Sequence, residues 1–228
     1  MITPEKLLES AKELETQLRT WRRTLHRHPE VGFDLPETKA LVKKALTEMG
    51  YAPQDCGKCG VLALAGGKRP GKTILLRGDM DALPLQEESG EEFASEVPGK
   101  MHGCGHDMHT AMMLGAAQLL KEHEDEIEGT VKLEFQPAEE IGQGARPLIA
   151  AGMLDGAQRV FGLHTASDLP AGAVGVKPGA NNAGVDHFII RIHGKSAHVS
   201  TPQLGVDALY IASELVVALQ SIVTRITS

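Results

Sequence analysis

The sequence predicts an α/β fold in which helices cover a mixed, mostly parallel sheet. Short apolar runs of strand character alternate along the chain with longer segments whose apolar residues recur at helical spacing. Such alternation favours helices packed on a largely parallel sheet. The 228 residues are 42% hydrophobic, which suffices for one sizeable domain or one domain plus part of another. Functional loops should then follow the carboxyl ends of the strands.

Proline and glycine mark the ends of the predicted helices. Pro29 follows the first helix, Pro36 opens the second, and Gly50 closes it. The third begins directly after a loop rich in histidine and glycine. The predicted helices are residues 4–28, 36–49, 107–123 and 145–151.

The predicted strands are residues 61–65, 73–77, 131–135 and 159–163. A turn rich in glycine at 66–71 separates the first two. Acidic residues or a histidine follow each of the last three strands, where an α/β protein carries its functional groups.

Beyond a glycine- and asparagine-rich linker at 178–184, the pattern changes. Residues 185–193 alternate as a strand, and residues 205–226 have the periodicity of an apolar helix. One strand and one helix cannot bury both of their faces, so they predict the beginning of a second domain. The expected division is therefore residues 1–182 and residues 183–228.

Composition excludes several classes of partner. The net charge of −7 argues against a general nucleic-acid binder, because phosphate contacts require clustered lysine and arginine. No segment approaches the roughly 20 apolar residues that span a bilayer, so no membrane partner is expected. The N-terminus lacks the apolar run of a signal peptide. Three cysteines do not make a disulfide framework, which favours the cytoplasm.

Cys104 and His106 are the strongest candidate metal ligands. They stand two residues apart between glycines, whose backbone can wrap an ion. A buried cysteine and a helix-capping histidine are the structural alternative, since cysteine is often buried without a role. The neighbouring His102 and His109 fit that structural alternative better than a ligand role.

Glu139 and Glu140 end another predicted strand, and His164 ends the next. Adjacent acids in one cleft can divide the work, one binding metal and the other moving protons. Asp79 and Asp81 also end a strand, although Gly-Asp is ordinary turn chemistry as well.

Two further patterns are weaker. Cys56 and Cys59 have Cys-x-x-Cys spacing but no second pair, so this segment is interpreted as an incidental loop. Gly66 and Gly67 beside two basic residues lack the spacing of a phosphate-binding loop and indicate a turn.

Five motifs occur together in a fixed order along the chain. They are Trp-Arg-Arg-Thr-Leu-His-Arg-His-Pro-Glu-Val-Gly-Phe (21–33), Arg-Gly-Asp-Met-Asp-Ala-Leu-Pro (77–84), His-Gly-Cys-Gly-His-Asp (102–107), Phe-Gln-Pro-Ala-Glu-Glu (135–140) and Gly-Lys-Ser-Ala-His (194–198). With them the chain resembles the aminoacylase/carboxypeptidase dinuclear metallohydrolase family, in the branch of hippurate hydrolases and indole-acetyl-amino-acid amidohydrolases. The resemblance runs from about Trp21 to the end.

The resemblance implies a zinc-peptidase-like catalytic α/β domain followed by a smaller α+β lid domain that mediates dimerisation. It implies metal ligands at these positions: Cys104 in the bridging place, His106, Glu140 and His164. Glu139 would be the general base, and Asp81 would orient a ligand or tune the site. His198, in the lid motif, would contact the substrate carbonyl. Asp79 stands where sister branches carry a ligand histidine.

The implied activity is hydrolysis of the amide bond of N-acyl amino acids or small peptides by a metal-activated water. Two divalent ions are implied. Thiolate and imidazole ligands suit Zn, the resemblance favours Mn, and Co or Ni stays open. The full-length form would be a homodimer through its lid.

Members of this family are longer and supply one more ligand histidine near the C-terminus. The sequence therefore leads us to expect a catalytic domain that lacks its C-terminal return, with an incomplete metal site. Two alternatives stay open: a truncated, inactive metal-binding fragment or interaction protein, and a dipeptidase or carboxypeptidase of the same mechanism.

Overall fold

The computed structural model describes residues 3–182 and 184–225, with side chains described to residue 222. The chain divides into two units, Met1–Ala171 and Gly172–Ser228. The division falls shortly before the linker expected at 178–184. Among the described residues, none of the helices is long and apolar enough to cross a bilayer.

The first unit contains a five-stranded mixed sheet within its described part. Its strands are β1 (Gln54–Cys56), β2 (Gly60–Gly66), β3 (Thr73–Asp79), β4 (Thr130–Gln136) and β5 (Ala157–Gly162), in the order β1-β2-β4-β3-β5. β3 pairs in parallel with β4 and with β5, whereas β2 runs antiparallel to β1 and β4. Four strands thus point the same way, which confirms the predicted mixed, mostly parallel sheet.

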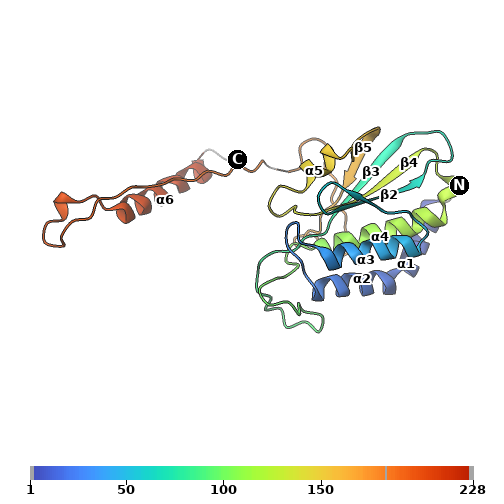
Figure 1. Ribbon diagram of the computed structural model, residues 1–228, viewed down its shortest axis with the longest axis horizontal. Helices are drawn as coiled ribbons and strands as arrows, with labels where there is room; N and C mark the ends of the chain where they lie inside the picture. Colours follow the sequence, from blue (N-terminus) through green and yellow to red (C-terminus); the bar gives the residue numbers. More distant parts are fainter. Residues whose placement is uncertain (1–2, 183, 226–228) are drawn as a thin grey trace. The chain divides into compact units, whose positions relative to one another are not determined.

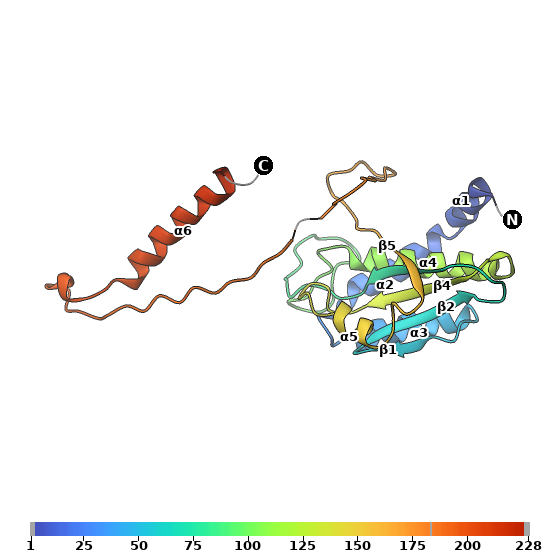
Figure 2. The ribbon, with the colours of Figure 1, turned by 90° about the horizontal axis from the view of Figure 1, so that it is seen from above.

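Helices cover one face of this sheet in two layers. α3 (Pro36–Glu48) and α4 (His106–Glu122) lie directly on the strands, and α2 (Glu15–Arg27) packs on α4 farther out (Figures 1 and 2). The short α5 (Ala145–Ala150) packs its Leu148 against the opposite face. The predicted helices 36–49, 107–123 and 145–151 are confirmed.

The single helix predicted over 4–28 is wrong. The chain instead forms α1 (Pro4–Glu13) and α2, separated at Leu14. The amide of Leu14 bonds to the Ala11 carbonyl three residues back, which closes a tight turn. Both helices face α4, so the apolar spacing continues across the break and conceals it.

Two features of the sheet were not predicted from the sequence. β2 and β3, which follow one another in the chain, are not neighbours, because β4 lies between them. β1 was not predicted, since its last residue, Cys56, belongs to the Cys-x-x-Cys segment. Cys56 packs with Leu148 on the α5 side of the sheet, whereas Cys59 packs against the cluster under α3 and α4. The two thiols therefore do not form one redox or zinc site.

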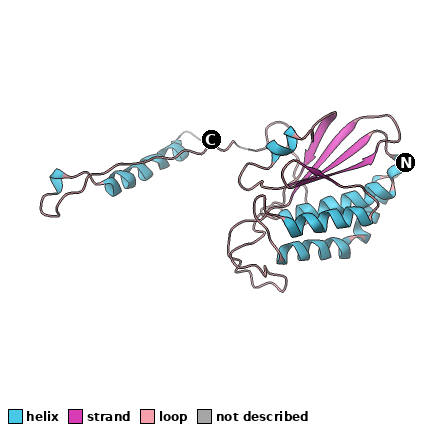
Figure 3. Cartoon of the chain, viewed as in Figure 1, coloured by secondary structure: helices cyan, strands magenta, loops and turns pink. Residues whose placement is uncertain are grey.

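Within its described residues, the second unit contains α6 (Ala208–Arg225) and an isolated bridge that joins Lys195 to Val206. Asp207 caps the helix by accepting the amides of Leu209 and Tyr210 at 2.9 and 3.0 Å, so the helix begins later than predicted. The strand predicted over 185–193 is wrong for the described residues, which Figure 3 draws as loop. A strand needs a hydrogen-bonded neighbour, and the described chain offers this segment none.

Candidate metal centre

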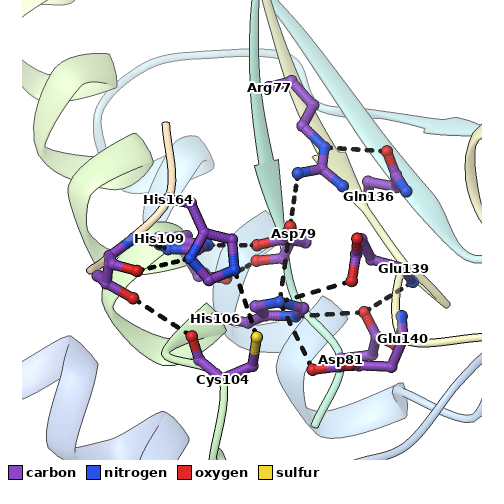
Figure 4. Close-up of polar contacts among 12 residues, drawn as sticks. Arg77, Asp79, Asp81, Cys104, His106, His109, Gln136, Glu139, Glu140 and His164 are labelled. Carbon is purple, nitrogen blue, oxygen red and sulfur yellow. Dashed lines mark hydrogen bonds and ion pairs between the residues drawn. The ribbon is translucent and has the colours of Figure 1, made fainter. Parts of the chain in front are cut away.

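The carboxyl ends of three parallel strands meet at one edge of the sheet. The register pairs Asp79 of β3 with Gln136 of β4, and Arg77 of β3 with Gly162 of β5. α4 crosses from β3 to β4, so its N-terminus reaches the same edge. The side chains gathered there are Asp79, Asp81, Cys104, His106, Glu139, Glu140 and His164 (Figure 4).

His106 lies at the centre of this group. Its Nε2 is 3.7 Å from Asp79 Oδ2, 3.8 Å from Glu139 Oε2 and 3.7 Å from Glu140 Oε1. The residue is fully buried, yet neither ring nitrogen has a hydrogen-bond partner. These separations are too long for hydrogen bonds. They resemble the roughly 3.4 Å between two ligand atoms bound about 2.1 Å from one ion.

Cys104 and His164 form the other side of the centre. Cys104 Sγ lies 3.3 Å from His164 Nε2. His164 Nδ1 faces the carbonyl of Thr165 at 2.7 Å and must donate its proton there. In the neutral ring, Nε2 then carries the lone pair and points toward the thiol. A backbone carbonyl that fixes the tautomer in this way is typical of a metal-binding histidine.

The loop that carries Cys104 is held against the end of β5. Gly105 has φ +91°, and a Cβ there would lie 2.4 Å from Thr165 Oγ1. That hydroxyl donates to the Cys104 carbonyl at 3.2 Å. The glycine noted in the sequence is therefore required both by the left-handed backbone and by this close approach.

Asp81 sets the direction of the two glutamates. Its Oδ1 accepts the amide of Glu139 at 3.0 Å, and its Oδ2 accepts the amide of Glu140 at 3.2 Å. The preceding Ala138 has φ +53°, so the chain turns sharply as it leaves β4. Asp81 Oδ1 is also 3.5 Å from His106 Nδ1. One buried carboxylate thus orients both acidic residues beside the central histidine.

Asp79 makes structural contacts that the sequence did not indicate. His109 Nδ1 lies 2.6 Å from Asp79 Oδ1, and His109 Nε2 accepts the amide of Thr165 at 2.9 Å. Both nitrogens of His109 are therefore engaged, although its atoms lie near a candidate metal group. Arg77 Nη1 pairs with Asp79 Oδ2 at 2.5 Å. Arg77 is the first residue of the 77–84 motif, and this position is the sequence signal that could have identified it as a site residue.

The charges of the centre favour a bound cation. Burial alone would raise the pKa of Asp79, but the hydrogen bond with His109 and the Arg77 charge lower it to about 2. Burial and the nearby Glu140 raise the pKa of the Cys104 thiol to about 12. Oε1 of Glu140 is buried without a partner. An acidic, thiol- and imidazole-containing set with orphaned buried atoms fits divalent metal ions.

His198 belongs to the second unit and lies, in the sequence, beyond the elements that build this centre. Its Nδ1 lies 2.7 Å from Ser200 Oγ and accepts the Ser200 amide at 3.2 Å. Nδ1 is therefore the acceptor, and Nε2 bears the proton of the neutral ring. The side chain is exposed, with a donor available to a ligand.

The comparisons with known proteins all point to the same family. A sequence model of Peptidase family M20/M25/M40 matches residues 75–227. The N-acetyl-L-cysteine deacetylase of Bacillus subtilis (strain 168) is 48% identical over 213 residues, which are 93% of this chain and 51% of that protein. IAA-amino acid hydrolase ILR1-like 5 of Arabidopsis thaliana is 45% identical over 206 residues, which are 90% of this chain and 47% of that protein.

A solved structure agrees with these sequence relatives. A Bacillus subtilis protein described as a dinuclear metal binding peptidase from the M20 family is similar with a TM-score of 0.70 and 46% identity, covering 73% of this chain and 47% of that one. The chain spans about half the length of the curated relatives it matches. The resemblance inferred from the five motifs is confirmed.

Proposed function

The chain belongs to peptidase family M20/M25/M40, and we propose that it is a metal-dependent amidohydrolase that cleaves the C–N bond of N-acyl amino acids. One observation carries the proposal: at the strand ends, His106 lies among four carboxylates, 3.5 to 3.8 Å from each. The similar deacetylase and hydrolase support the choice of a small N-acyl amino acid as substrate.

The residues that would hold two divalent metal ions, Mn or Zn, are Cys104, His106, Glu140 and His164. Co and Ni are further ions that these donors accept. When bound, such ions polarise an amide carbonyl and lower the pKa of water. Asp79 lies beside His106 and would contribute negative charge that balances the ions.

Glu139 would move the proton. Its side chain is 39% exposed, with Oε2 3.8 Å from His106 Nε2, so it can face both the ligand group and a substrate. As a carboxylate it would take a proton from the attacking water and return it to the leaving amine nitrogen. Asp81 acts through its hydrogen bonds to the Glu139 and Glu140 amides and is therefore a positioning residue.

His198 would complete the reaction from the second unit. Its proton-bearing Nε2 is the type of donor that stabilises negative charge on the amide oxygen. We propose that this unit serves as the lid and joins two copies in a homodimer. We further propose a cytoplasmic protein with no nucleic-acid or membrane partner, which fits three free cysteines and a net charge of −7.

The test is release of free amine from a panel of N-acetyl, N-benzoyl and indole-acetyl amino acids, with unblocked dipeptides alongside. Protein stripped by a chelator is compared with protein reloaded with Mn or Zn. We expect turnover of the acylated substrates only after reloading. Preference for the dipeptides would instead indicate a peptidase of the same mechanism. Bound metal without turnover of any substrate would contradict the proposed activity.

A further inference from the structure

A chain of buried polar side chains lies behind the candidate metal centre. Nε2 of His26 is 3.2 Å from Glu87 Oε1, and its Nδ1 is 2.7 Å from Asp107 Oδ2. The side chains of Glu87, His26 and Asp107 are only 3%, 5% and 0% exposed. Arg22 Nε donates to the same Asp107 oxygen at 2.7 Å. None of these four residues belongs to the ligand group.

His26 lies between two carboxylates. Each ring nitrogen faces an oxygen of Glu87 or Asp107, and Arg22 Nη2 also lies 3.5 Å from Nδ1. The hydrogen bond with Asp107 is the largest cause that raises the pKa of His26, and the bond with Glu87 adds to it, so the protonated ring between two carboxylates is favoured. Charge-assisted hydrogen bonds of this kind are about twice as strong as neutral ones. The contacts at 2.7 and 3.2 Å thus form a stiff link.

One end of the link holds the helix that presents His106. Asp107 directly follows His106 in the first turn of α4. Fixing the Asp107 carboxylate from α2 fixes the rotation and position of that turn. A carboxylate at this place also interacts favourably with the helix dipole. The link therefore acts on the orientation of His106 without touching it.

The other end of the link holds the loop that leads to Cys104. Glu87 Oε2 accepts the amide of Ser95 at 2.6 Å, and Oε1 accepts the Ser89 hydroxyl at 2.5 Å. The loop closes where Leu83 pairs with Met101. Asp81 lies just before this pair in the sequence, and Cys104 lies just after it. Tethering the loop at Glu87 thus restrains both approaches to the centre.

We propose that the Glu87–His26–Asp107 chain is a positioning element that holds His106 and Cys104 in metal-binding geometry. The inference rests on the metal centre of the proposed function but not on hydrolysis. Outer hydrogen-bond partners of ligands typically change metal affinity by about 10–100-fold when removed. His26, Glu87 and Asp107 do not hydrogen-bond a ligand side chain themselves. They act through the first turn of α4 and the loop to Cys104, and an effect of the same order is expected here.

The test is a Co(II) titration followed by the thiolate-to-cobalt absorption band, with Cys104→Ser used to assign the band. We expect His26→Leu and Asp107→Asn to weaken Co(II) binding by roughly 10–100-fold. The matched control is Arg23→Gln. Arg23 also ties the loop to α2, through Glu92 at 2.6 Å and the Phe93 ring. That ring packs edge-on against His26, but Arg23 itself forms no hydrogen bond or ion pair with His26, Glu87 or Asp107 among the described residues. This variant should bind Co(II) within about twofold of the wild type.

Circular dichroism of the metal-free proteins shows whether each variant folds. If His26→Leu does not fold, Glu87→Gln replaces it in the Co(II) titration, because it keeps the shape of the Glu87 side chain and removes its negative charge. If the folded variants of the Glu87–His26–Asp107 chain bind Co(II) with wild-type affinity and show an unchanged thiolate-to-cobalt band, the positioning role is overturned. A wild type that binds Co(II) tightly but turns over no substrate would contradict only the proposed hydrolysis. Failure of the positioning role and failure of the proposed hydrolysis are therefore distinguishable.

Discussion

The carboxylate of Asp79 and the imidazole of His109 lie 2.6 Å apart in the buried interior beside the candidate metal centre. The second nitrogen of His109 accepts the Thr165 amide, so the ring joins the end of β3 to the residue after His164. His109 therefore has no free lone pair for an ion. His106, three residues earlier, has two orphaned nitrogens.

The first prediction separates these two histidines by metal content. His106→Gln should reduce the number of Zn or Mn ions bound per chain, because it removes the central donor. His109→Gln should keep the wild-type number and lower the melting temperature, because it breaks two buried hydrogen bonds, each worth about 1 kcal/mol. Equal metal loss in both variants, measured by elemental analysis, would contradict the distinction.

The second prediction concerns Asp81. Asp81→Asn replaces one accepting oxygen with a donor that faces an amide donor, so the Glu139–Glu140 turn should loosen. We expect turnover to fall by roughly 10–100-fold. Glu30→Gln is the matched control, because Glu30 also accepts two amides, those of Glu37 and Thr38 at 3.1 and 2.8 Å, at the start of α3. A similar loss of turnover in both variants would indicate a general loss of stability and would contradict a specific role of Asp81 at the Glu139–Glu140 turn.

The third prediction is a pH dependence of stability caused by Glu134. This residue is fully buried in β4 with neither oxygen hydrogen-bonded. Burial raises its pKa to about 8, although the Arg77 charge opposes the shift. The folded protein then keeps a proton that the unfolded chain releases near pH 4.5. The free energy of unfolding should fall as pH rises between these values, by roughly 1.4 kcal/mol per pH unit.

Glu134→Gln stays neutral at every pH and should lose this dependence. Its gain in stability over the wild type should be small near pH 5 and largest near pH 8, as measured by urea unfolding. Glu92→Gln, at a side chain 70% exposed, is the control and should follow the wild-type curve. Parallel curves for the wild type and Glu134→Gln would contradict a protonated Glu134.

The fourth prediction follows from the Cys104 thiol, whose pKa is raised to about 12 by burial and by Glu140. Near neutral pH the thiol is protonated without metal, so a binding ion must displace its proton. Apparent Zn affinity should therefore rise with pH by about tenfold per unit for this one proton. Cys104→Ser should flatten that rise. Affinity that does not change between about pH 6 and 8 would contradict the prediction.

The sequence predicted the strand ends and the residues that follow them. An apolar run followed by Asp79, Glu139 or His164 is visible locally, and parallel strands bring such ends together. The order of strands was not visible, since β4 enters between β2 and β3 from more than fifty residues away in the chain. The bond between Asp79 and His109 likewise joins positions that neither periodicity nor spacing relates.

Local patterns also failed where an element depends on its neighbours. Residues 185–193 alternate as a strand does, but alternation cannot supply a partner strand. α1 and α2 read as one helix because α4 imposes the same apolar spacing on both. The link from Glu87 through His26 to Asp107 joins two distant motifs, 21–33 and 102–107, to a residue outside all five motifs, so it becomes visible only in the folded chain.

The most direct test of Glu139 as the proposed proton carrier compares the wild type with Glu139→Gln, measuring bound metal and amine release on the same samples. We expect an unchanged number of ions, because Glu139 is proposed as the proton carrier and not as a ligand. We expect turnover to fall by about 10²–10⁴-fold, the usual contribution of a general base. Turnover retained by the variant, or metal lost together with activity, would contradict the assignment.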